Sequence, residues 1–264
     1  MLLKKFLMNT KNNKAFVTKY PEHYDAVYKD KNYSQECKRI IGFLSNKKKI
    51  SNILDLGCGT CSHSIILSRS GYKIHAVDKS EKMLEIAKKK IEKNNITNIK
   101  LINCDVENLN LEKYSYDVVI LLFNVVGYLK NINNFFSNIK KFMKKDSMLI
   151  FDFWHDQAVE YNGPKKTLKT FKYKDYTIEK KVDGHLNNID KIINIKISTT
   201  KFNNNKILSE SYESHSVKFY NLNSLKKIIE KEGFEILKFE DFNSAGQLPN
   251  KNNWSAYCVS KFLG

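Results

Sequence analysis

Short apolar runs alternate with segments of helical periodicity between residues 34 and 153. The runs have the length of strands, and the segments between them repeat apolar residues at the spacing of a helix face. The predicted strands are 52–56, 73–77, 99–103, 117–122 and 147–153, and the predicted helices begin near 34 and cover 62–70, 81–93 and 132–143. Repeated strand–helix units form a parallel sheet, and the apolar run at 117–122 is typical of a central strand that helices cover on both faces.

Polar and apolar residues alternate between residues 154 and 220, which predicts antiparallel strands. Residues that favour turns interrupt the alternation at Asp183 and Gly184 and again at 203–205. A helix at 222–232 and strands at 234–239 and 254–260 follow. We therefore expect an α/β, Rossmann-like fold whose mostly parallel seven-stranded sheet has helices on both faces and is built from residues 1–153 and 221–264. An antiparallel β-sheet of residues 154–220 is inserted after the fifth strand.

The composition adds a strong positive charge to this picture. Lys and Arg number 45 against 28 Asp and Glu, which gives a formal net charge of +17 and attracts anions. Lysine runs are usually solvated helix faces, so we interpret them as solvated faces rather than as a nucleic-acid surface. The positive field would also attract a small anionic molecule. The sequence has no stretch of 18 apolar residues, and its five scattered cysteines do not suggest a disulfide framework. We expect a cytoplasmic protein with reduced thiols and no membrane partner.

A glycine-rich segment, Asp55 to Thr60, follows the first predicted strand and precedes a helix. Its glycines, Gly57 and Gly59, let the backbone turn sharply and let a ligand approach without meeting a Cβ. A dinucleotide site would have a third glycine after two more positions, but Cys61 and Ser62 stand there. The segment therefore predicts a ligand-binding loop without the usual pyrophosphate pattern.

Acidic residues end the next two predicted strands. Asp78 closes the strand at 73–77 and can accept hydrogen bonds from both hydroxyls of a ribose. Asp105 closes the strand at 99–103, where it can accept a hydrogen bond from an adenine amino group while Val106 packs on the ring. An Asp after a strand is by itself an ordinary turn or capping residue. In this order, however, the acids outline an adenosine without phosphate.

These motifs resemble the class I S-adenosylmethionine-dependent methyltransferases over about residues 20–155. The resemblance implies that the glycine loop takes the methionine portion of S-adenosylmethionine, Asp78 the ribose, and Asp105 with Val106 the adenine. Met83 is similarly placed to pack on the other face of the adenine, with helix core as the open alternative. Cys61 departs from the family, which usually has glycine there. The residues expected at the cofactor are Tyr33, Asp55, Gly57, Cys58, Gly59, Asp78, Lys79, Met83, Asp105, Val106 and Phe123.

A closer resemblance, to the small-molecule branch that includes sugar-nucleotide N,N-dimethyltransferases, rests on residues 24–28, 123–129 and 151–154 together with Tyr33. It implies that Tyr28 and Tyr128 face the transferred methyl group and that Tyr33 helps to hold the methionine carboxylate. His215 is a third candidate catalytic residue because its strand should return over the carboxyl end of the sheet; a cross-strand or exposed histidine is the alternative. We expect no metal site.

The resulting hypothesis is methylation of oxygen or nitrogen on a nucleotide-linked or phosphorylated sugar, in carbohydrate biosynthesis. No Asn-Pro-Pro-Tyr or Asp-Pro-Pro-Tyr element follows the fourth predicted strand, which disfavours methylation of amino groups on nucleic-acid bases. An RNA methyltransferase and a non-catalytic S-adenosylmethionine-binding module are the alternatives. The inserted sheet leaves a homodimer open.

Overall fold

The computed structural model describes residues 15–16, 19–45, 50–111, 116–204 and 206–264. Contacts within the chain divide it into two compact units. The larger unit comprises residues 32–163 and 218–264, and the smaller unit comprises residues up to 31 together with 164–217. Among the described helices, none is both long enough and apolar enough to cross a membrane.

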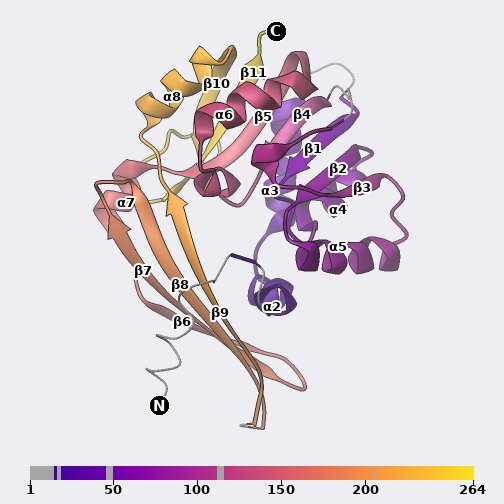
Figure 1. Cartoon of the computed structure of the whole chain (residues 1–264), viewed down its shortest axis with the longest axis vertical. Helices are drawn as coiled ribbons and strands as arrows, with labels where there is room; N and C mark the ends of the chain where they lie inside the picture. The colour runs from indigo at the N-terminus through magenta and orange to yellow at the C-terminus, as the bar shows by residue number, and fades with distance from the viewer. Residues whose placement is uncertain (1–14, 17–18, 46–49, 112–115, 205) are drawn as a thin grey trace. The chain divides into compact units, whose positions relative to one another are not determined.

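The larger unit contains a seven-stranded sheet in the order β10-β11-β5-β4-β1-β2-β3 (Figure 1). Pairing is parallel from β5 through β4, β1 and β2 to β3, whereas β11 is antiparallel to both β5 and β10. The strands are β1 (Asn52–Leu56), β2 (Lys73–Asp78), β3 (Ile99–Asn103), β4 (Tyr116–Leu121), β5 (Met143–Trp154), β10 (Phe234–Asp241) and β11 (Ser255–Phe262). The carboxyl ends of β1, β2, β3 and β4 therefore meet at one edge of the sheet.

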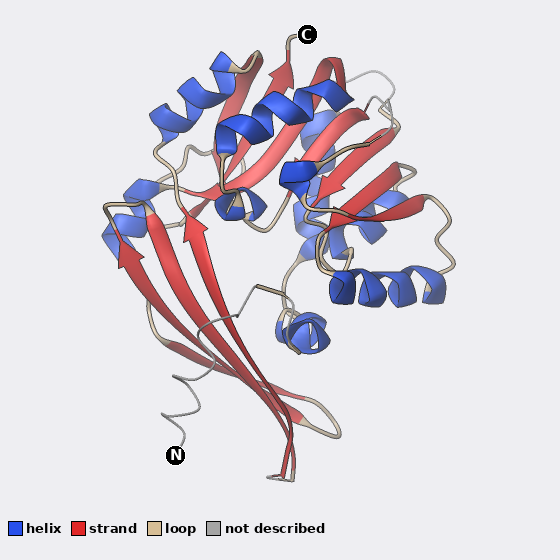
Figure 2. Ribbon diagram, viewed as in Figure 1, coloured by secondary structure: helices blue, strands red, loops and turns tan. Residues whose placement is uncertain are grey.

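Helices cover both faces of this sheet (Figures 1 and 2). One apolar core joins the sheet to α3, α4 and α5, and the other joins it to α6 and α8. The helices are α3 (Tyr33–Leu44), α4 (Ser62–Arg69), α5 (Glu81–Lys93), α6 (Ile132–Ile139), α7 (Asp156–Asn162) and α8 (Leu222–Lys231), with short 3-10 turns η1 (Val106–Asn108), η2 (Val125–Tyr128) and η3 (Lys140–Phe142). The predicted fold class, a mostly parallel seven-stranded α/β sheet with a separate antiparallel sheet, is confirmed.

The helix predicted at 132–143 is shorter than expected. It ends at Ile139, a single 3-10 turn follows, and β5 already begins at Met143. Met143 pairs with Tyr116 and Met148 pairs with Val118, so the intervening residues form a bulge. Because a bulge hides the period-two pattern of a strand, the sequence pattern placed the start of this strand at 147.

The smaller unit contains a four-stranded sheet in the order β6-β7-β8-β9 and one helix, α2 (Tyr20–Val27). Its strands are β6 (Thr167–Lys172), β7 (Thr177–Asn187), β8 (Ile192–Asn203) and β9 (Lys206–Lys218), drawn as the long arrows of Figure 2. The turn predicted at Asp183 and Gly184 is wrong, because both residues pair with β8 inside β7. A Cβ on Gly184 would lie 2.7 Å from Pro164, so this glycine serves close packing.

The unit boundaries differ from the predicted residues 154 and 220. The first helix, α2, belongs with the inserted sheet: His23 bonds to Thr199 on β8 at 2.6 Å and to Ser209 on β9 at 2.8 Å. At the other boundary, α7 belongs with the larger unit, where His155 forms a bridge with Tyr220. Residues at the start of the chain and residues about 180 positions later thus form one core, which local periodicity does not reveal.

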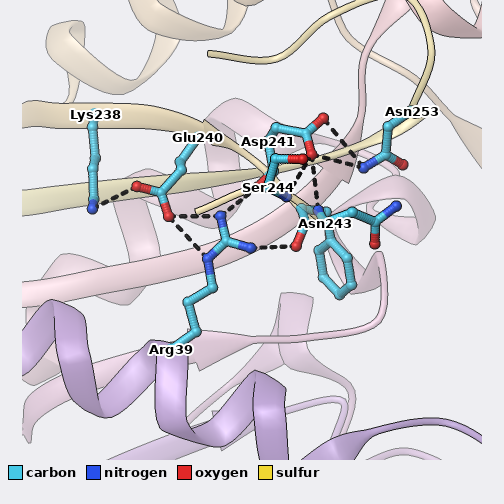
Figure 3. Close-up of polar contacts among 8 residues, drawn as sticks. Arg39, Lys238, Glu240, Asp241, Asn243, Ser244 and Asn253 are labelled. Atoms are coloured by element: carbon cyan, nitrogen blue, oxygen red, sulfur yellow. Dashed lines mark hydrogen bonds and ion pairs between the residues drawn. The ribbon is translucent and has the colours of Figure 1, made fainter. Parts of the chain in front are cut away.

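Arg39 on α3 ties that helix to the end of β10 (Figure 3). Its guanidinium donates to the Glu240 carboxylate at 2.9 and 2.6 Å and to the carbonyl oxygens of Asp241 and Phe242. Burial acts to raise the pKa of Glu240, but Lys238 and Arg39 hold it below its ordinary value. The Glu240 side chain is only 5% exposed, so it depends on these two cations.

We predict that Arg39→Met lowers the free energy of unfolding by about 3 kcal/mol, because Glu240 then stays buried with Lys238 as its single cation. Urea unfolding measures this change. Arg69→Met is the control, since Arg69 bonds to Asn94 at an exposed position, and its effect should stay within about 0.5 kcal/mol. Equal effects of the two substitutions would contradict a special role for Arg39.

Candidate functional site

The glycine loop after β1 turns over the end of β2. The amides of Gly57 and Cys58 donate to the Val77 carbonyl at 2.8 and 3.0 Å. Gly57 has a φ of +72°, and a Cβ there would lie 2.6 Å from Val125, so only glycine fits. Gly59 has a φ of +54°, and a Cβ there would meet nothing within 4 Å among the described residues. The backbone at Gly59 therefore borders open space.

Cys61, where the family usually has glycine, has a left-handed φ of +60° at the start of α4. Cys61 therefore adopts the left-handed backbone conformation that usually favours glycine. Burial, with smaller contributions from Cys61, raises the pKa of the Cys58 thiol well above its ordinary value. A protonated thiol is a poor nucleophile and metal ligand. Among the described residues no group of three His, Cys, Asp or Glu side chains could hold a metal ion.

Asp78 ends β2 and holds the glycine loop in place. One carboxylate oxygen accepts the Gly59 amide and the other accepts the Ser80 amide, both at 2.8 Å. Burial raises the pKa of Asp78, and these two N–H groups oppose the rise. Because a carboxylate has about four lone-pair sites, both oxygens keep acceptor capacity for ribose hydroxyls. The arrangement fits the role predicted for Asp78.

Asp55 on β1 is buried beneath the loop. Its carboxylate accepts a hydrogen bond from the Ser64 hydroxyl on α4. Burial raises its pKa to about 6, against opposing contributions from Ser64 and His63. All the contacts described for Asp55 are internal, so it supports the loop from below. Direct contact with the cofactor stays a prediction for this residue.

The residues predicted around the adenine lie at the ends of β2 and β3. The Cys104 amide donates to the Asp78 carbonyl at 3.1 Å, which links these two strand ends. Asp105 follows at once and caps η1 by accepting the Glu107 amide at 3.0 Å. Val106 is half-buried and Lys79 is exposed. Met83, 2% exposed, is buried on α5 but lies in neither large apolar cluster, so both of its interpretations stay open.

A tight turn follows β4 at the same edge of the sheet. Phe123 and Asn124 have left-handed φ values of +71° and +57°, and the Asn124 amide donates to both oxygens of Asp152 on β5, at 3.0 and 2.9 Å. The Asn124 side-chain amide is buried and lacks a hydrogen-bond partner among the described residues. Sequence reasoning missed Asn124; its tolerance of left-handed backbone was the available signal. Tyr128 ends η2 four residues later and is half-buried.

Tyr33 opens α3 and packs edge-on against His63 of α4, with 4.9 Å between ring centroids. His63 in turn lies 2.7 Å from the Glu36 carboxylate. Because His63 is the second residue of the helix that follows the glycine loop, these contacts bring Tyr33 to the start of that helix. Its position beside the methionine end of the cofactor stays a prediction.

The structure places Tyr28 and His215 in the smaller unit and Tyr128 in the larger one. The His215 side chain is 1% exposed and lies 3.1 Å from the Glu213 carboxylate. Tyr28 is half-buried at the end of α2, where its hydroxyl accepts a hydrogen bond from Lys180 at 2.8 Å. Sequence reasoning also missed Lys180, a buried lysine that lies on β7 beside the exposed Lys181. The catalytic roles of all three predicted residues stay predictions.

We predict that Asp55 makes stability depend on pH between about 4 and 6. Its folded pKa of about 6 lies above the ordinary 3.8, so the folded state keeps a proton that the unfolded state has released. The resulting stabilisation is complete below pH 4 and is lost as the pH rises through 6. The difference in pKa corresponds to about 3 kcal/mol. Urea unfolding of the wild type and of Asp55→Asn measures this effect. Between pH 4 and pH 7 the free energy of unfolding of the wild type should fall by about this amount relative to that of Asp55→Asn. A difference between the two proteins that does not change with pH would contradict the assignment.

Comparisons with known proteins agree with this geometry. The methyltransferase domain family matches residues 53–146, which include the glycine loop, Asp78 and Asp105. Malonyl-[acyl-carrier protein] O-methyltransferase 1 of Ilyobacter polytropus is 30% identical over 235 residues, which cover 85% of this chain and 76% of that protein. The chain spans 51% and 41% of the length of two other curated relatives, both putative methyltransferases.

Solved structures with the same fold include a S-adenosylmethionine-dependent methyltransferase from Clostridium acetobutylicum, with a TM-score of 0.78, 19% identity, and coverage of 93% of this chain and 98% of that one. The sugar N-methyltransferase KedS8 from Streptoalloteichus has a TM-score of 0.76, 12% identity, and coverage of 95% and 96%. At such identities the likeness establishes the fold, and the relatives in sequence establish the family. The chain belongs to the S-adenosylmethionine-dependent methyltransferases, with S-adenosylmethionine as its cofactor.

Proposed function

We propose that this protein transfers a methyl group from S-adenosylmethionine to an oxygen or nitrogen of a small anionic acceptor, a nucleotide-linked or phosphorylated sugar. The observation that carries the transfer reaction is the glycine loop held by Asp78, with open space at Gly59. This loop lies at the carboxyl edge of the sheet, where open α/β sheets bind their ligands.

The residues around the loop fit S-adenosylmethionine in shape and in polarity. Gly59 has room for a ligand to approach its backbone, Asp78 keeps acceptor capacity for the ribose, and Asp105 lies at the neighbouring strand end for the adenine. Tyr33 would lie at the methionine end. When bound, the cofactor supplies an electrophilic methyl group on a sulfonium. The chain's own task is to hold acceptor and cofactor in line, because positioning supplies most of the acceleration in a displacement of this kind.

The acceptor residues we propose are Tyr28 and Tyr128, whose hydroxyls can orient a nucleophile by hydrogen bonding. An amine needs only to lose its proton before it attacks, whereas a sugar hydroxyl needs a base. His215 is the candidate base, and the Glu213 carboxylate, 3.1 Å from its imidazole, can orient the ring.

A sugar acceptor is supported by the likeness of fold to the sugar N-methyltransferase KedS8. The net charge of +17 supports an anionic group on that acceptor. The relative of Ilyobacter polytropus favours a second candidate, methylation of a malonyl carboxylate on an acyl-carrier protein, because this relative aligns over 85% of this chain. A carboxylate acceptor is already ionised at neutral pH and needs no base, so the two candidates differ in what they require of His215.

We predict that Asp78→Ala weakens S-adenosylmethionine binding by at least about tenfold, since it removes the ribose acceptor and releases the Gly59 and Ser80 amides. Isothermal titration calorimetry measures the dissociation constant. The control is Asp175→Ala, because Asp175 is an exposed residue of the smaller unit. This variant should bind S-adenosylmethionine with the affinity of the wild type. Unchanged binding by Asp78→Ala would rule out the ribose assignment.

We predict that Tyr128→Phe slows methyl transfer by at least about tenfold while cofactor binding stays intact, because only the acceptor loses a hydrogen bond. Transfer of labelled methyl groups is followed with nucleotide-linked amino sugars, nucleotide-linked neutral sugars and malonyl-acyl-carrier protein. Tyr161→Phe is the matched control, because Tyr161 is 63% exposed. A wild-type rate for Tyr128→Phe removes it from the acceptor site, and no product with any of the three classes refutes the proposed function.

A further inference from the structure

Lys180 is a buried cation in the smaller unit. The residue is 8% exposed, although it lies on β7 between residues that reach solvent. Its ammonium lies 2.8 Å from the Tyr28 hydroxyl, 4.1 Å from the centroid of the Tyr28 ring and 5.8 Å from that of Tyr20. Aromatic faces and one phenol oxygen from α2 therefore surround this charge.

No carboxylate balances this charge among the residues that the structure describes. The strand neighbours paired with Lys180 are Lys169 on β6 and Thr199 on β8, and neither is acidic. The nearby acid, Glu213, accepts the Phe16 amide at 2.8 Å and pairs with His215. A buried ammonium without an opposite charge is unfavourable even after the protein relaxes around it.

Tyr20 does not supply the missing negative charge. Burial first, and then the neighbouring Tyr28, raise the pKa of Tyr20 well above its ordinary value, so its hydroxyl stays protonated. The Tyr20 hydroxyl also bonds to the Tyr28 hydroxyl at 3.4 Å. An ammonium has three N–H donors, and among the residues that the structure describes only the Tyr28 oxygen accepts a hydrogen bond from Lys180. Cation–π contacts add attraction but accept no conventional hydrogen bond.

We propose that Lys180, with the hydroxyls of Tyr20 and Tyr28, forms an anion-binding subsite that takes an oxyanion of the acceptor. This inference rests on the proposed function in one respect: the bound anion is taken to be part of the methyl acceptor. A diphosphate of a nucleotide-linked sugar and a malonyl carboxylate share the required chemistry, which is a compact, negatively charged group of oxygen acceptors. The same subsite would place Tyr28, a candidate acceptor residue, next to the bound anion.

Calorimetry on the full chain with two probes, uridine diphosphate and malonate, tests the subsite. We expect the wild type to bind one of them and Lys180→Met to weaken that binding by at least about tenfold. Lys181→Met is the matched control, since Lys181 is the next residue of the same strand and is exposed; it should change the affinity less than about twofold. Binding of uridine diphosphate alone points to a nucleotide-linked acceptor, and binding of malonate alone points to a carboxylate acceptor.

A second measurement uses the wild type alone, so it tests the subsite even if Lys180→Met does not fold. Lysines of the wild type are methylated reductively with and without the bound probe, and mass spectrometry follows each one. We expect the probe to slow modification of Lys180 at least about fivefold and to leave Lys181 unchanged. The proposal is overturned if neither probe binds, if Lys180→Met binds as the wild type does, or if the probe leaves the modification of Lys180 unchanged. Probe binding through Lys180 without any methyl transfer would instead refute the proposed function alone.

Discussion

The Asp78 carboxylate joins the segments on which the cofactor site depends. It accepts amides from the glycine loop and from the residue that caps α5, so the loop after β1, the end of β2 and the start of α5 are fixed to one another. The parallel register of β1 and β2 brings these segments to the same edge. Left-handed backbone at Gly57, Gly59 and Cys61 is then compatible with a single ordered loop rather than several. The hydrogen bonds that hold the loop thus leave lone pairs for the ligand.

Much of the larger unit could be predicted from the sequence, because strands such as β1 and helices such as α5 are local and strongly periodic. The glycine loop and Asp78 could also be predicted from the sequence, because residues at the carboxyl ends of neighbouring parallel strands lie at the same edge of the sheet. The partnership of α2 with β7 to β9 could not be predicted, because it joins segments more than 150 positions apart through His23 and buried tyrosines. Gly184 indicated a turn, but its role is close packing against Pro164. The burial of Lys180 could not be predicted either, because the exposed Lys181 stands next to it in the sequence.

The turn after β4 has an unfavourable backbone conformation close to the predicted functional site. Two successive residues with positive φ, neither of them glycine, are unfavourable by of order 1–3 kcal/mol each. The Asp152 carboxylate and the contact of Val125 with Gly57 hold the turn in that conformation. The turn therefore depends on both the neighbouring strand and the glycine loop. A ligand that displaced the loop would also disturb the segment that leads to Tyr128.

The union of α2 with the inserted sheet has a consequence for the order of folding during synthesis. The helix leaves the ribosome before its partners Thr199 and Ser209, which follow about 180 residues later. The strands from β1 to β5 of the larger unit are complete before those partners exist. Contacts of such long sequence separation form slowly because of the entropy of closing the chain. The tyrosines that α2 buries in the folded protein consequently stay without these partners until β8 and β9 have been made.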